Sequence, residues 1–229
     1  PGALPLRRQA VIDRITRMEN VETRPLVLCF GDSLTAGYQT PSRGNPTGRE
    51  TPYGSFLEGF LGGRVRVAVS GICGETTGEM VLRFRPDVLE RRPRYVVMLG
   101  GTNDLGWNAS PREIMRNLVK MYELARAGGI VPIPVTVRSL GAPDAATENE
   151  ASHWLGDHIA KRQMLNGLIQ DYARSKDLQC LDLFTATADA DSLQLRPEYS
   201  NDGLHLTTEG YRRFALLLHE RIFSTLPIT

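Results

Sequence analysis

The chain has 229 residues, of which 41% are hydrophobic and 23% are charged. This length suits one well-buried domain and is too short for two of ordinary size. The formal net charge is only +1, and no basic stripe with interleaved aromatic side chains occurs. Nucleic-acid binding therefore has little support. No apolar run approaches the length that spans a bilayer, so we expect a soluble globular protein.

The three cysteines indicate the cellular compartment in which we expect the protein. The chain contains three cysteines, so they cannot all pair internally. Cys29 and Cys180 lie in apolar, strand-like runs and Cys73 lies in a glycine-rich loop. We expect free thiols in a reducing, cytoplasmic environment. The charged N-terminus also lacks the apolar core of a signal peptide.

The N-terminal segment 1–24 is predicted to form an amphipathic helix, because Leu6, Ala10, Val11, Ile15 and Met18 recur at helical spacing. Residues 25–229 are predicted to form a single domain. Its first strand is the apolar run 26–30, which ends at Gly31. The further predicted strands are 65–69, 95–99, 130–137 and 178–183. Pro132 and Pro134 remove donors from the fourth of these, which should be short or frayed.

Helices are predicted between these strands. The first covers residues 77–89. The second begins at Ser110-Pro111-Arg112-Glu113, a capping box with proline in the first turn, and runs to Ala127. A closing helix covers residues 207–223. Alternating strands and helices indicate an α/β protein whose parallel sheet is covered on both faces. The polar stretches 38–52 and 139–152 show no helix or strand pattern, and are either lids over a site or tolerated surface insertions.

Polar side chains with catalytic potential follow the predicted strands. Ser33 follows the first strand, Asn103 follows the third, and Asp202 and His205 precede the last helix. In open α/β sheets, ligands bind beyond the carboxyl ends of the strands. We therefore expect Ser33 and Asn103 to lie at the same edge of the sheet.

Ser33 is the candidate nucleophile, since a turn after a strand exposes its hydroxyl. The alternative is that Ser33 is only a helix N-cap. The surrounding residues do not match the Gly-x-Ser-x-Gly elbow of α/β-hydrolases. His205 is the candidate base, and Asp202, three residues earlier, is the candidate group that orients it. The alternative is that Asp202-Gly203 is a plain turn. No zinc-binding motif occurs, and we predict neither metal nor cofactor.

Three groups are candidate donors to the oxyanion that forms when an ester is attacked. The Asn103 amide can donate without changing its protonation state, although Gly-Gly-Thr-Asn-Asp is also good turn chemistry. The backbone N–H groups of Ser33 and Gly74 would complete the oxyanion hole. Gly71 competes with Gly74 for this role, and an ordinary strand-to-helix turn would explain both glycines.

Four blocks of this sequence resemble the SGNH (GDSL-type) hydrolase family, in the family's order. They are Gly31-Asp32-Ser33-Leu34, Ser70-Gly71-Ile72-Cys73-Gly74-Glu75-Thr76, Gly100-Gly101-Thr102-Asn103-Asp104 and Asp202-Gly203-Leu204-His205. The second block departs from the pattern, because many members carry asparagine where this chain has Val69-Ser70-Gly71.

The resemblance implies a three-layer α/β/α, flavodoxin-like fold with a five-stranded parallel sheet. It also implies metal-free hydrolysis of esters or thioesters. Ser33, Gly74, Asn103 and His205 would fill the four family roles, and Asp202 would complete the triad. The expected partner is a small acyl ester, and the oligomeric state stays open. Acyl transfer at the same site, a non-catalytic carbohydrate- or partner-binding domain, and a nucleotide-binding flavodoxin-like protein are the alternatives.

Substrate size has fewer signals. Trp107 and Leu105 closely follow Asn103 and are candidates for an acyl pocket, with ordinary packing as the alternative. Tyr38, Trp154 and Leu155 are further candidates. We expect short-chain acyl esters.

Overall fold

The computed structural model of the protein describes residues 24–43, 45–141 and 148–227. The helix expected over residues 1–24 thus lies outside the described residues, apart from Arg24. None of the helices in the described part of the chain combines the length and apolarity needed to cross a membrane.

A parallel sheet forms the centre of the protein, with its strands in the order β2-β1-β3-β4. The strands are β1 (Leu26–Gly31), β2 (Arg66–Gly71), β3 (Tyr95–Leu99) and β4 (Val131–Pro134). All of β3 is buried, and so is β1 after its first residue, which explains their continuous apolar sequences. Gly31 pairs with Gly71 on one side and with Leu99 on the other. Three strands therefore end together at one edge of the sheet.

The expected fifth strand at 178–183 is reduced to a parallel bridge between Val135 and Leu181 in the described structure. The Val131 N–H donates to the carbonyl of Arg94, just before β3, and the Val135 N–H donates to the carbonyl of Met98 in β3. The alternate positions, which would donate to a fifth strand, are Pro132 and Pro134 and carry no N–H. Two hydrogen bonds remain on that side. The Leu181 N–H donates to the Pro134 carbonyl, and the Leu181 carbonyl accepts from the Thr136 N–H. The following residue, Asp182, already caps helix α8 (Leu183–Thr187).

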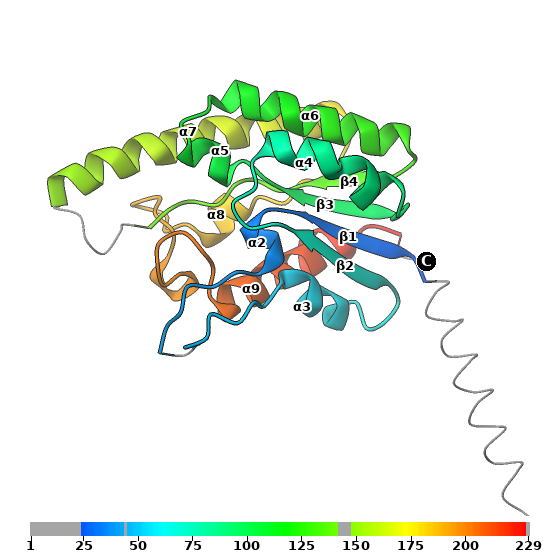
Figure 1. Ribbon diagram of the computed structural model, residues 1–229, viewed down its shortest axis with the longest axis horizontal. Coiled ribbons are helices and arrows are strands. Elements are labelled where there is room, and N and C mark those ends of the chain that lie inside the picture. Colours follow the sequence, from blue (N-terminus) through cyan, green and yellow to red (C-terminus); the bar gives the residue numbers. More distant parts are fainter. Residues whose placement is uncertain (1–23, 44, 142–147, 228–229) are drawn as a thin grey trace, which may run out of the picture.

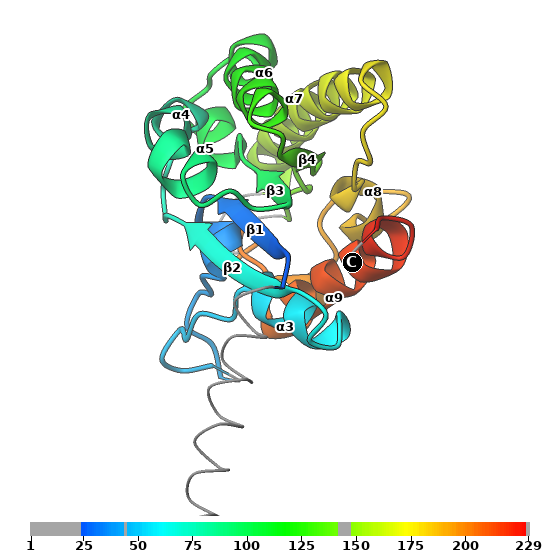
Figure 2. The same ribbon diagram turned by 90° about the vertical axis from the view of Figure 1, so that its right-hand side faces the viewer.

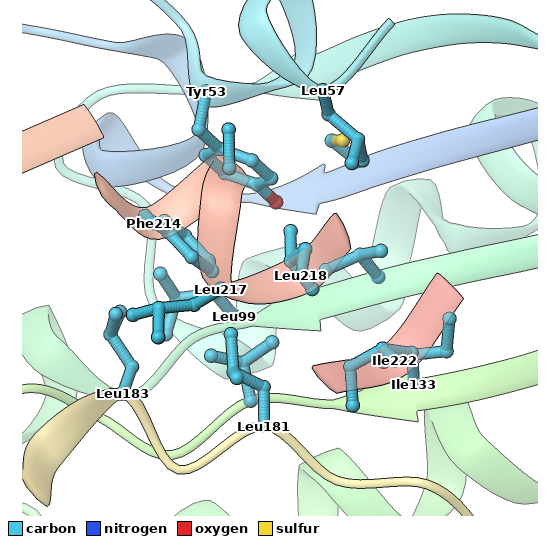
Figure 3. Close-up of a cluster of buried hydrophobic side chains, with 14 of the residues drawn as sticks. Tyr53, Leu57, Leu99, Ile133, Leu181, Leu183, Phe214, Leu217, Leu218 and Ile222 are labelled. Carbon is cyan, nitrogen blue, oxygen red and sulfur yellow. The ribbon is translucent and has the colours of Figure 1, made fainter. Parts of the chain in front are cut away.

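Helices cover both faces of the sheet (Figures 1 and 2). On one face lie α3 (Tyr53–Phe60) and α9 (Thr208–Leu218). On the other lie α4 (Thr77–Phe84), α6 (Pro111–Ala127) and α7 (Glu148–Ser175). Figure 3 shows the first layer, where Tyr53 and Phe214 pack with ring centroids 4.0 Å apart over the sheet residue Leu99. The three-layer α/β/α arrangement predicted from the sequence is confirmed.

The predicted helices are found with small differences at their ends. The capping box is present: Ser110 Oγ accepts from the Glu113 N–H, and the Glu113 carboxylate accepts from the Ser110 N–H. The helices expected over 77–89 and 207–223 are α4 and α9, each extended by a π-helical turn. These turns are η1 (Arg85–Leu89) and η3 (His219–Phe223).

The sequence patterns missed α3 and α7, and α7 begins inside the stretch 139–152 that was expected to lack helix. Helix α7 was missed because polar residues occupy its buried face. Arg162 and Asn166 interrupt the apolar residues Leu155, Ile159 and Ile169 there. Short helices also went unrecognised. They are α2 (Ser33–Ala36), α5 (Thr102–Gly106), α8 and the 3₁₀ turn η2 (Pro197–Tyr199). The stretch 38–52 contains an isolated bridge between Ser42 and Asn45.

Candidate active site

Ser33 lies directly after β1 as the first residue of α2, and it is 7% exposed. The N-cap of this helix is Asp32, whose Oδ1 accepts from the Leu34 N–H at 2.9 Å. The alternative that Ser33 is only the N-cap is therefore wrong, because Asp32 is the N-cap. The side chain of Ser33 remains available for other chemistry.

Two glycines permit the close packing that positions α2. A Cβ on Gly31 would lie 2.2 Å from the Leu99 carbonyl oxygen, and a Cβ on Gly71 would lie 2.2 Å from the Ala36 nitrogen. Both obstacles are backbone atoms, which cannot rotate aside as a side chain does. Gly71 is thus explained by the approach of β2 to α2. Gly74 has φ +79° and open space around its Cβ position, so it is the better candidate for a ligand-facing N–H.

His205 and Asp202 form a hydrogen-bonded pair, with Nδ1 2.8 Å from Oδ2. Asp202 Oδ1 also accepts from the backbone N–H groups of Leu204 and His205, at 2.8 and 2.6 Å. Thr40 Oγ1 donates to Asp202 Oδ2. Burial raises the pKa of the Asp202 carboxyl, but these hydrogen bonds outweigh it and hold that pKa well below its ordinary value. Asp202 is therefore ionised at neutral pH, and its bond to Nδ1 leaves His205 Nε2 free to accept a proton.

The segment after α2 connects the serine to this pair. The Tyr38 N–H donates to the Ser33 carbonyl at 3.0 Å. The Tyr38 ring packs edge-on against the His205 ring, with centroids 4.6 Å apart, and the Tyr38 carbonyl accepts from the Tyr211 hydroxyl of α9. Sequence reasoning had considered Tyr38 only as a pocket residue and had missed Thr40.

Asn103 lies on α5, past the end of β3, at the same edge of the sheet as α2 (Figure 1). Its Nδ2 donates to the Glu75 carbonyl oxygen at 2.8 Å, and the second N–H of the amide is left for a ligand. This bond joins Asn103 to the loop that carries Gly74. The structure thus connects the two candidate oxyanion donors that belong to different strands.

An arginine that sequence reasoning missed fixes the Gly74 loop. Arg83 of α4 forms a bidentate ion pair with Glu75. Its Nε lies 2.7 Å from Oε1, and its Nη2 lies 2.5 Å from Oε2. The same guanidinium bonds Asp87 and the Gly31 carbonyl. Asp104 acts in a similar way, because its carboxylate accepts from the Thr77 N–H and hydroxyl at the start of α4. Apart from the i,i+4 spacing of Arg83 and Asp87, no residue spacing in the sequence indicates these partners.

Beside these groups is a pocket of about 320 Å³. Its lining includes Asn103, Asp202, Trp107, Trp154 and Leu204. The two tryptophans that the sequence suggested as pocket residues do line it. Leu105 and Leu155 do not, because both are buried in hydrophobic clusters. The turn at Asp202 is held against the pocket by a hydrogen bond from the Gly141 N–H to the Gly203 carbonyl.

Comparison with known proteins agrees with this arrangement. The sequence profile of the GDSL-like lipase/acylhydrolase family matches residues 29–213. The uncharacterised lipoprotein YqeF of Bacillus subtilis is 34% identical over 116 residues, which are 48% of this chain and 47% of that protein. An arylesterase of Vibrio mimicus is 34% identical over 116 residues, covering 49% and 54%. The chain spans about half the length of these curated relatives.

Among solved structures, a GDSL-like lipase from Bacteroides thetaiotaomicron superposes with a TM-score of 0.69 at 25% identity. The match covers 93% of this chain and 98% of that one. The extent of the family match and the position of its residues at one sheet edge lead to one conclusion. The chain belongs to the GDSL-like lipase/acylhydrolase family.

Proposed function

We propose that this protein is a serine esterase that hydrolyses short-chain carboxylic esters or thioesters through an acyl-enzyme. The observation that carries the proposal is the hydrogen bond of 2.8 Å between His205 Nδ1 and Asp202 Oδ2. It holds the imidazole by Nδ1 and leaves Nε2 free, as the proposed base for Ser33 requires. The arylesterase of Vibrio mimicus supports the same reaction class.

In the proposed reaction, Ser33 Oγ attacks the carbonyl carbon of the ester while His205 Nε2 accepts the hydroxyl proton. The ionised Asp202 stabilises the imidazolium that forms. The oxyanion accepts hydrogen bonds from the Ser33 and Gly74 N–H groups and the Asn103 amide. His205 then protonates the leaving alcohol or thiol as the tetrahedral intermediate collapses to the acyl-enzyme. Water repeats these steps and releases the acid.

The pocket supports a small substrate. Its volume of about 320 Å³ is at the lower end of the range for small-molecule sites. Its walls include the apolar side chains of Trp107, Leu140 and Trp154, which suit a short acyl or aryl group.

Acyl transfer to an alcohol is the second enzymatic candidate, since the same residues would serve it. Transfer needs water to be excluded from the acyl-enzyme. The side chains of His205 and Asp202 are 18% and 24% exposed, so the candidate base is partly open to solvent. This exposure favours hydrolysis.

The test is hydrolysis of a p-nitrophenyl ester series, from acetate to palmitate, by the wild type and by Ser33→Ala. Ser42→Ala is the matched control, because Ser42 is a serine of the loop 38–52 whose Oγ accepts a hydrogen bond from the Asn45 N–H. We expect activity on the short esters in the wild type and in Ser42→Ala, and its loss in Ser33→Ala. Equal activity in Ser33→Ala would remove Ser33 from the mechanism, and no activity on any ester would contradict the proposed function.

A further inference from the structure

The pocket beside the candidate triad contains a buried cation. Arg162 of α7 lines this pocket and is 2% exposed. Its Nη1 lies 3.4 Å from the His158 carbonyl oxygen, and its Nε has no hydrogen-bond partner among the described residues. None of the ion pairs found in the described part of the chain includes Arg162.

A guanidinium in this position is unfavourable by itself. The free energy of desolvating a buried charge without a paired anion is far larger than the stabilisation that one hydrogen bond provides. Burial, followed by the field of Arg138, lowers the pKa of Arg162 to about 9, so the group still carries its charge at neutral pH. Arg83 shows how the same chain treats another largely buried arginine, since it is paired with Glu75 and Asp87.

The neighbouring groups do not neutralise Arg162. Arg138 is also buried, and its Nη1 donates to the Ser139 carbonyl at 2.5 Å. Burial lowers the pKa of Arg138 to about 10, and the fields of Tyr211, Asp32 and Asp202 oppose this change. Burial and the charges of Arg162 and Lys161 lower the pKa of His158. Among the residues that line the pocket, Arg162 is thus the one arginine or lysine, and the Asp202 carboxylate is already hydrogen-bonded to His205 and Thr40.

We propose that this pocket binds a carboxylate of the ester substrate through Arg162. The inference rests on the proposed esterase function and narrows its substrate class to anionic esters. A carboxylate is planar and matches the guanidinium fork with two parallel hydrogen bonds. Asn103 and Asp202 line the same pocket, so a carboxylate bound there would belong to the molecule whose ester bond is being broken.

The carboxylate has two chemical sources. It can belong to the acyl half, as in mono-esters of dicarboxylic acids, or to the alcohol half, as in acetyl esters of hydroxy acids. One experimental arm uses monoethyl esters of dicarboxylic acids from succinic to suberic. The other uses O-acetyl hydroxy acids of increasing length. Each compound is compared with its primary amide, which has the same shape without the charge, by titrating the acid released at constant pH.

In the wild type we expect kcat/KM for the carboxylate to exceed that for the amide by about 10- to 100-fold in one arm, as for a hydrogen bond to a charged group. Arg162→Met should abolish this preference, and Arg162→Lys should leave an intermediate one because it keeps the charge but not the fork. Lys161→Met is the control. It removes the adjacent charge of α7, whose Nζ bonds Asn108, and should keep the preference.

Stability provides an independent measurement. Replacing an unpaired buried charge by an apolar side chain is usually neutral or stabilising, so Arg162→Met should unfold at the same temperature as the wild type or higher. Should that variant not fold, free dicarboxylates can be tested on the wild type. They should inhibit hydrolysis of p-nitrophenyl acetate competitively and more strongly than their monoamides.

Two results would overturn the inference and leave the esterase intact. They are equal kcat/KM for carboxylate and amide in both arms, and a preference that persists in Arg162→Met, each while Ser33-dependent hydrolysis of p-nitrophenyl acetate proceeds. Absence of hydrolysis of every ester, neutral or charged, would overturn the proposed function and this inference together.

Discussion

Asp202 belongs to the candidate triad and Asp32 directly precedes Ser33, but their surroundings shift their pKa values in opposite directions. Asp202 accepts hydrogen bonds from His205, Thr40 and Leu204 and stays ionised. Asp32 is fully buried, and its Oδ2 has no hydrogen-bond partner among the described residues. Burial raises the pKa of Asp32 to about 6, against the lowering effect of its hydrogen bond from Leu34 and the charge of Arg138. Environment thus separates two identical side chains into different roles.

Asp32→Asn tests the shifted carboxyl at Asp32. In the unfolded chain Asp32 titrates near pH 4 and in the folded protein near pH 6. The stability that Asp32 contributes is therefore present below pH 4 and is lost as the pH rises through 6. Asparagine keeps the N-cap acceptor for Leu34 and removes the titration. Between pH 4 and 7 the wild type should lose about 2 to 3 kcal/mol of unfolding free energy relative to this variant.

Urea unfolding at both pH values measures this difference. Asp182→Asn is the matched control, because Asp182 is also an N-cap, bonding the Thr185 N–H at 3.0 Å, but is partly exposed. We expect its stability to follow that of the wild type across this range. If Asp32→Asn did so as well, the buried ionised carboxylate would not be the source of the pH dependence.

Asn103→Ala tests the oxyanion role. Removing one preorganised donor should lower kcat by about two to three orders of magnitude, with a much smaller change in KM. Steady-state kinetics on p-nitrophenyl acetate measures both quantities. Asn201→Ala, an exposed asparagine next to Asp202, is the control and should keep the wild-type kcat. An unchanged kcat in Asn103→Ala would remove this amide from the mechanism.

At the scale of elements, the ends of the strands decide where the candidate catalytic groups lie. β1 delivers Ser33, β3 delivers Asn103, and the loop after β2 carries Gly74. Arg83 holds that loop to β1 through the Gly31 carbonyl at 2.9 Å. Helix α4 thus contributes to the candidate site through Arg83, which positions the Gly74 loop.

Gly71 and Gly74 should respond differently to alanine. In Gly71→Ala the new Cβ would collide with the backbone of Ala36, which should cost about 2 to 3 kcal/mol and lower kcat because α2 shifts. In Gly74→Ala the strain of a positive φ should cost about 1 kcal/mol, while the retained N–H should preserve most of kcat. Thermal unfolding and kcat measured together check the ranking. A Gly74→Ala variant less stable than Gly71→Ala would contradict it.

At the scale of the whole molecule, the sequence predicted the layers and the strand ends because both follow from local patterns. Continuous apolar runs locate β1 and β3, and the capping box locates the start of α6. The fifth strand could not be predicted correctly, since its loss depends on which side of β4 the prolines face. Helix α7 was not predicted, because Arg162 and Asn166 occupy its buried face.

The candidate site divides in the same way. Ser33, Asp202 and His205 are recognisable from short motifs, because each motif is local. The residues that support the candidate site come from other elements. Thr40 bonds Asp202, Arg83 holds the Gly74 loop, and Arg162 lines the pocket. Only the folded arrangement brings these groups together, and no spacing along the chain encodes them.

We propose that Ser33, activated by His205, forms a covalent acyl-enzyme. The most direct measurement is labelling with a fluorophosphonate, followed by mass spectrometry of the intact protein and its peptides. We predict one adduct per chain, on the peptide containing Ser33, with labelling slowed strongly in His205→Ala and absent in Ser33→Ala. An adduct on another residue, or equal labelling rates in the wild type and His205→Ala, would contradict the account.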